Sequence, residues 1–167
     1  MEELFNDHGW RIFLETGKLP DGRQKTMARA ERVDSVHLLA FTDDGRVLML
    51  REFRPIYGTY IWMLPSGRID KEKNREVAAQ RELQEETGYK AKSLTYYCTT
   101  QPSESMVFAN HIFIARDLTK DPLPQDAEEM IEVHELSLEE AIDNVLASKF
   151  VHTASAYALL RYLREKK

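Results

Sequence analysis

The feature that most constrains the fold is the segment Gly67–Tyr89, which reads as a loop followed by a helix. Asn74 is a favourable N-cap residue, and Glu76 lies in the first turn, where the helix dipole stabilises an anion. Gly88 suits the left-handed position just past a helix end. These signals predict a helix that begins after Asn74 and ends before Gly88.

Three glutamates lie toward the C-terminal end of this predicted helix, where the dipole favours cations instead. Glu82, Glu85 and Glu86 are spaced i, i+3, i+4, so they share one flank of the helix within an arc of about 100°. Each like-charge pair of this kind costs roughly 0.2–0.5 kcal/mol. A bound cation would turn the repulsion into attraction, and ligation by oxygen alone suits Mg²⁺ or Mn²⁺. A solvated acidic helix end is the simpler alternative for an isolated pair of glutamates.

The residues around the glutamates favour the metal-binding interpretation. The run 81–88 reads Arg-Glu-Leu-Gln-Glu-Glu-Thr-Gly and follows Gly67 at a fixed distance. This pattern resembles the Nudix box, Gly-x5-Glu-x7-Arg-Glu-apolar-x-Glu-Glu-x-Gly-apolar, which would cover residues 67–89. One fixed position departs from it, because Lys73 stands where the first Glu belongs, directly after Glu72.

Length and composition limit the classes of protein to which the chain can belong. With 167 residues, of which 43% are hydrophobic, the chain suits one domain, 1–167, with a core of its own. A net charge of −5 gives no electrostatic reason to expect binding to nucleic acid or membranes, since both favour clustered Lys and Arg. Cys98 is the only cysteine, which excludes an internal disulfide, and no apolar run approaches the length of a signal core or a membrane span. We therefore expect a cytoplasmic protein.

The rest of the sequence predicts strands on both sides of the box and two helices at the end. Within residues 1–31 we expect a hairpin around the turn Asp21-Gly22, and it could cover its own sheet or cross to a second copy. The expected strands are 10–15, 24–30, 33–41, 46–53, 91–99, 107–115 and 131–136, and the final helices are 138–146 and 153–165. This order indicates an α/β or α+β fold with a mixed sheet and helices against it.

The same order matches the α/β/α sandwich of the Nudix fold, and the chain is most similar to the ADP-ribose and nucleoside-diphosphate-sugar pyrophosphatases. The similarity is carried by the hairpin containing Gly22, by the strand end 51–55 with the following 64–67, and by Pro102 after the box. It implies metal-dependent hydrolysis of the diphosphate linkage of a nucleotide sugar to a nucleoside monophosphate and a sugar phosphate. It also implies a homodimer in which the hairpin reaches the partner.

The resemblance further assigns roles to the carboxylates. Metal ions would be held by Glu82, Glu85 and Glu86 and by the main-chain carbonyl of Ser66. The catalytic candidates are Glu85, Glu86 and Glu104, of which Glu104 is the acid of the loop that joins the strands after the box. An ordinary exposed loop acid is the alternative interpretation of Glu104.

Two arginines and a proline are the candidates for substrate binding. In the family, the second arginine of such a strand end contacts the diphosphate, which corresponds to Arg54. Arg51 and Arg54 are an odd number of positions apart, so at most one of them faces a given cleft in a regular strand, and we favour Arg54. Pro102, beyond the box, is the third candidate.

Three departures from the family pattern keep alternatives open. Met63 stands where sugar-nucleotide members often have Glu, and the loop after the box lacks a carboxylate at the usual distance past Pro102. Lys73 replaces the Glu that usually pairs with the box arginine, Arg81. Lys73 is the feature that supports a Nudix-fold module that binds a nucleotide sugar without cleaving it. Other enzyme alternatives are hydrolysis of nucleoside triphosphates, dinucleoside polyphosphates or capped RNA, of which the net acidity disfavours RNA.

Overall fold

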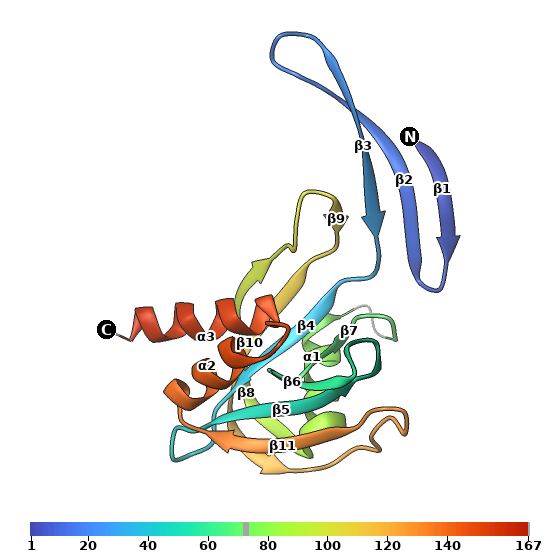
Figure 1. Cartoon of the computed structure of the whole chain (residues 1–167). Helices are drawn as coiled ribbons and strands as arrows, with labels where there is room; N and C mark the ends of the chain where they lie inside the picture. The colour runs from blue at the N-terminus through green and yellow to red at the C-terminus, as the bar shows by residue number, and fades with distance from the viewer. Residues whose placement is uncertain (72–73, 167) are drawn as a thin grey trace.

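The structure is a computed structural model that describes residues 1–71 and 74–166. Lys73, the departure from the box, lies outside the described residues, as does Glu72. The chain forms a body of sheets and helices, and its N-terminal strands extend away from this body (Figure 1).

The N-terminal sheet is a meander of strands β1 (Glu2–Asp7), β2 (Trp10–Lys18) and β3 (Gln24–Glu31), with the short β9 (Met106–Val107) parallel to β3. The expected hairpin of β2 and β3 is present and turns at Gly22, whose φ is +89°. Strand β1 was not expected from the sequence. All of its residues are exposed, so backbone pairing with β2 rather than burial holds it in place.

The mixed sheet of the body has the order β7-β4-β10-β8. Its strands are β4 (Ser35–Ala40), β7 (Ser66–Arg68), β8 (Tyr89–Thr100) and β10 (Asn110–Lys120). Strands β4 and β10 run parallel, and the other pairs are antiparallel. Because β7 pairs with β4 at its edge, the start of the box is attached directly to the buried centre of the fold.

A second, antiparallel sheet has the order β11-β5-β6. Its strands are β5 (Val47–Arg54), β6 (Thr59–Met63) and β11 (Ile131–Leu136), and a 3₁₀ turn, η1 (Pro55–Tyr57), joins β5 to β6. Pro55 begins this turn because it has no N–H for a strand ladder.

The helices are α1 (Arg75–Thr87), α2 (Leu138–Ala147) and α3 (Thr153–Glu165), close to the expected ranges. The Asn74 side chain accepts from the N–H groups of Glu76 and Val77, and Gly88 ends α1 with a φ of 73°, so both predicted caps are confirmed. Among the described residues, no helix is long and apolar enough to cross a membrane.

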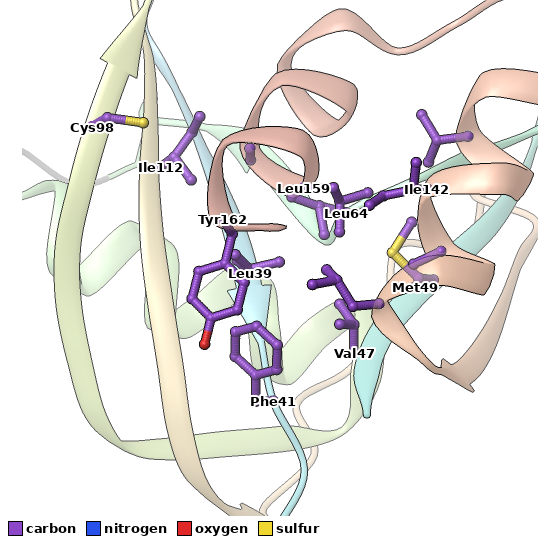
Figure 2. Close-up of a cluster of buried hydrophobic side chains, with 14 residues drawn as sticks. Leu39, Phe41, Val47, Met49, Leu64, Cys98, Ile112, Ile142, Leu159 and Tyr162 are labelled. Carbon is purple, nitrogen blue, oxygen red and sulfur yellow. The ribbon is translucent and has the colours of Figure 1, made fainter. Parts of the chain in front are cut away.

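The core lies on both faces of β4, because successive side chains of a strand point to opposite sides. Leu38 and its alternate neighbours pack against α1, in a cluster that includes Leu83. On the other face, Figure 2 shows Leu39 and Phe41 beside side chains of α3, and the rings of Phe41 and Tyr162 lie 4.8 Å apart. The layering of helices on both faces of a mixed sheet agrees with the predicted α/β/α sandwich.

Candidate active site

A cavity of about 700 Å³ is lined by the edge of the mixed sheet, the C-terminal half of α1, the end of β5 and the first residues of α3. The predicted site residues that line it are Arg54, Ser66, Glu82, Glu85, Glu86 and Pro102. Segments far apart in the sequence therefore bring most of the predicted residues to one place.

Two of the box glutamates are buried in the wall of this cavity. Glu82 is 9% exposed and Glu86 is 6% exposed. Burial raises the pKa of Glu82 to about 7, although Arg81 opposes the shift. Burial also raises the pKa of Glu86 well above its usual range, and the hydrogen bond from the Ser66 N–H offsets only part of this. A cation bound here would favour the ionised form of both carboxylates.

Arg81 holds two of the three glutamates. Its Nη2 lies 2.8 Å from Glu82 Oε1, and its Nη1 lies 2.6 Å from Glu85 Oε2. As the side chains stand, no three His, Cys, Asp or Glu residues within the described ranges are arranged to hold a metal ion. The donors nevertheless fit a hard divalent cation, because they are oxygen atoms and two of the carboxylates are already desolvated. Such a cation would compete with Arg81 for Glu82 and Glu85.

Gly67 permits the close approach of β7 to α1. A Cβ at this position would overlap the carboxyl group of Glu82, so any larger residue would displace that carboxylate. The spacing of Gly67 and Glu82 in the box motif thus has a steric reason in this chain: the glycine makes room for a glutamate on the facing helix.

Arg54 also lines the cavity, together with Glu52 and Met63. Its Nη2 lies 2.7 Å from Glu52 Oε2 and 3.2 Å from Met63 Sδ. Arg51 lies on the other face of β5, where its Nη1 contacts Glu132 Oε2 at 2.8 Å, and it is outside the described lining of the cavity. Of the two arginines, the structure places Arg54 in the cavity wall and Arg51 on the opposite face of the strand.

The structure places Glu104 in an exposed loop, outside the part of the cavity wall that is described. A different acid, Glu129, lines the cavity from the segment before β11. The backbone N–H of Phe53 donates to the carbonyl of Met130 at 3.0 Å, which ties this segment to the end of β5. Glu129 is exposed overall, but partial desolvation raises its pKa, and its charge in turn raises the pKa of Glu82 and of Glu86. Sequence analysis missed Glu129; the signal available was an acidic pair, 128–129, just before a strand.

Part of the cavity wall carries neutral polar side chains. The Ser35 hydroxyl donates to Asn110 Oδ1 at 2.8 Å and lies 3.1 Å from His37 Nε2. Burial lowers the pKa of His37 to about 3 and that of His152 to about 4, so both imidazoles are neutral near pH 7. Neutral hydroxyl, amide and imidazole groups suit the hydroxyl groups of a sugar.

Comparisons with known proteins agree with this geometry. The NUDIX domain family matches residues 31–160. An ADP-ribose pyrophosphatase of Bacillus subtilis (strain 168) is 32% identical to this chain over 99% of it and 90% of its own length. A methanol dehydrogenase activator of Bacillus methanolicus is 24% identical over 98% of this chain and 89% of its own length. A solved structure of an ADP compounds hydrolase covers 99% of this chain and 91% of its own, with 22% identity and a TM-score of 0.79, and so has the same fold. The chain therefore belongs to the Nudix family and is a Nudix pyrophosphohydrolase.

Proposed function

We propose that this protein hydrolyses the diphosphate linkage of a nucleoside diphosphate sugar, with ADP-ribose as the first candidate. The products would be a nucleoside monophosphate and a sugar phosphate. The observation that carries the proposal is that the buried carboxylates of Glu82 and Glu86 share one cavity with the guanidinium of Arg54. The ADP-ribose pyrophosphatase that is similar along nearly the whole chain supports this choice of substrate.

Nudix hydrolases generally use divalent metals, and the oxygen donors of this site support Mg²⁺ or Mn²⁺. Glu82, Glu85 and Glu86, with the Ser66 carbonyl, would hold the ion. When bound, it supplies charge neutralisation at the diphosphate and lowers the pKa of water.

The chain's own residues would then bind and orient the reactants. Arg54 binds the diphosphate by charge-assisted hydrogen bonds. Glu129, whose pKa is raised by partial desolvation, takes the proton from the attacking water, in the role that the sequence had suggested for Glu104. His37, Ser35 and Asn110, which also line the cavity, contact the hydroxyl groups of the sugar.

We further propose that the protein is a homodimer in which the N-terminal sheet reaches the partner. Strands β1–β3 extend away from the body (Figure 1). The large apolar side chains Leu4 and Phe5 of β1 are 54% and 45% exposed. Contact with a second copy would remove this apolar surface from water.

The decisive test is product identification with purified protein. The protein is incubated with Mg²⁺ in separate reactions, each containing one substrate. The substrates are ADP-ribose, other nucleoside diphosphate sugars, a nucleoside triphosphate and a dinucleoside polyphosphate. We expect AMP and ribose 5-phosphate from ADP-ribose, and much slower cleavage of the triphosphate. Binding of nucleotide sugars without any cleavage, with Mg²⁺ or Mn²⁺, would instead establish a binding module.

A further inference from the structure

The side chain of Arg54 is turned back along its own strand. Arg54 is the last residue of β5, a position from which a long side chain could extend beyond the sheet into solvent. Its Nη2 instead contacts both Glu52 Oε2, at 2.7 Å, and Met63 Sδ, at 3.2 Å. Met63 pairs with Leu50 in the ladder of β5 and β6, so it lies farther back along the strand than Glu52. The guanidinium is therefore drawn inward over the cavity face of the sheet.

Glu52 is the carboxylate that makes this contact, and its position is otherwise unfavourable. Its side chain is 6% exposed, and burial raises its pKa, as does the nearby Glu129. Glu52 also adds to the negative charge that raises the pKa of Glu86. A buried carboxylate costs free energy unless it is paired, and here it faces a cavity that must accept an anionic diphosphate. The pairing with Arg54 is the interaction that offsets this cost.

Residues 52 and 54 lie on the same face of β5, because side chains two apart in a strand point to the same side. Glu52 and the Arg54 guanidinium therefore meet on the cavity side of the sheet. A contact of this kind restricts the rotamers of a long, flexible side chain before any ligand is bound. Ordering a free arginine at the moment of binding would weaken the affinity for substrate.

We propose that Glu52 is a positioning residue that holds Arg54 inside the cavity, ready to bind the diphosphate. This inference rests on the proposed function and deepens it. Glu52 itself touches neither the substrate nor the metal, and it acts through the guanidinium of Arg54 alone.

Kinetic comparison of Glu52→Ala, Arg54→Ala and the double variant tests the inference, with ADP-ribose as substrate and Mg²⁺ at saturation. We expect Glu52→Ala to raise KM about tenfold, a typical effect of losing one charge-assisted hydrogen bond, and to change kcat less than about threefold. The double variant should have the same KM as Arg54→Ala, because a residue that acts only through Arg54 has no effect once Arg54 is gone.

The chain offers a matched control on the opposite face of the same strand. Arg51 and Glu132 form an ion pair of 2.8 Å that lies outside the described cavity lining. Glu132→Ala should leave KM unchanged. A relocation variant combines Glu52→Gln with Met63→Glu, so that the carboxylate moves to the other residue that contacts Arg54 Nη2. The new carboxylate can form a charge-assisted hydrogen bond with the same nitrogen. KM should therefore return to within about threefold of the native value.

A large loss of kcat in Glu52→Ala at unchanged KM, or a changed Mg²⁺ requirement, would overturn the inference and place Glu52 in the metal or proton chemistry. Additive effects of Glu52→Ala and Arg54→Ala, or no recovery in the relocation variant, would also overturn it. A crystal structure of Glu52→Ala gives a readout that does not depend on catalysis. It should show the Arg54 guanidinium away from Met63; an unmoved guanidinium would contradict the inference even if the protein cleaves no nucleotide sugar.

Discussion

The backbone N–H of Ser66 donates a hydrogen bond of 2.7 Å to Glu86 Oε2, across 20 positions of the sequence. This bond ties the first residue of β7 to the last turn of α1, so the two ends of the box motif are held together at the cavity. It also stabilises the ionised form of a carboxylate whose pKa is raised by burial. The Glu86 carboxylate thus has two roles: it accepts a structural hydrogen bond from Ser66, and in its ionised form it can bind a cation.

Glu86→Gln should separate these two roles. The amide oxygen of Gln can still accept from the Ser66 N–H, so the thermal unfolding midpoint should stay close to that of the native protein. The negative charge is lost, and turnover of ADP-ribose should fall by orders of magnitude at saturating Mg²⁺. Unchanged turnover in this variant would remove Glu86 from the metal assignment.

Glu129→Gln and Glu104→Gln form a matched pair of loop variants. Glu129 lines the cavity, so its loss should lower kcat by roughly 10²–10⁴-fold, the usual contribution of a general base. Glu104 lies in an exposed loop, and its replacement should leave kcat within about twofold, as expected of a surface substitution. The pH–rate profile measures the difference directly, because the acidic limb should disappear only in Glu129→Gln. The reverse ranking would return the role of base to Glu104.

The raised pKa of Glu82 predicts a pH dependence of stability in the absence of metal. The pKa of Glu82 is about 7 in the folded protein, against an ordinary value of 4.5, so the folded state holds this proton more tightly than the unfolded state. Its contribution to the free energy of unfolding is therefore fully present below pH 4.5 and is lost as the pH rises through about 7. The two free energies of unfolding, of the native protein and of Glu82→Gln, are measured by denaturation at several pH values with chelator present. We expect the native protein to lose stability relative to Glu82→Gln as the pH rises. Added Mg²⁺ should reverse the decline, since a cation stabilises the ionised form. If the native protein instead gains stability relative to Glu82→Gln as the pH rises in chelator, the raised pKa of Glu82 is wrong.

Gly67→Ala should impair the site while the fold is kept. The added Cβ would displace the Glu82 carboxyl group, and we expect turnover to fall at least about tenfold and the Mg²⁺ requirement to rise. Titration of activity with Mg²⁺ compares Gly67→Ala with the native protein. Equal behaviour would show that the Glu82 carboxylate can move without functional loss.

Sedimentation of the full chain tests the proposed homodimer. A particle of about twice the chain mass of 19.4 kDa is expected. Phe5→Asp, which puts a charge on the exposed apolar surface of β1, should shift the equilibrium toward the monomer and lower activity in parallel. A native monomer with full activity would rule out a site that needs the partner.

Local sequence determined the elements around the box. Asn74 and Gly88 bound α1 as predicted, because capping depends only on backbone groups within a turn of the cap. Arg51 and Arg54 lie on opposite faces of β5, because side-chain direction in a strand alternates with period two. The glutamates of the box likewise came to one flank of one helix, where their mutual positions follow from the helical repeat.

Tertiary structure decided the rest of the site. Glu129 comes to the cavity from a segment that is hydrogen-bonded to the end of β5, and the buried Glu52 is paired there with Arg54. Strand β1 carries no apolar alternation that would place it, and its pairing with β2 alone makes it a strand. Caps and side-chain alternation are properties of a few neighbouring residues and can be read from sequence, whereas the charges that meet in a cavity depend on which distant segments pack together.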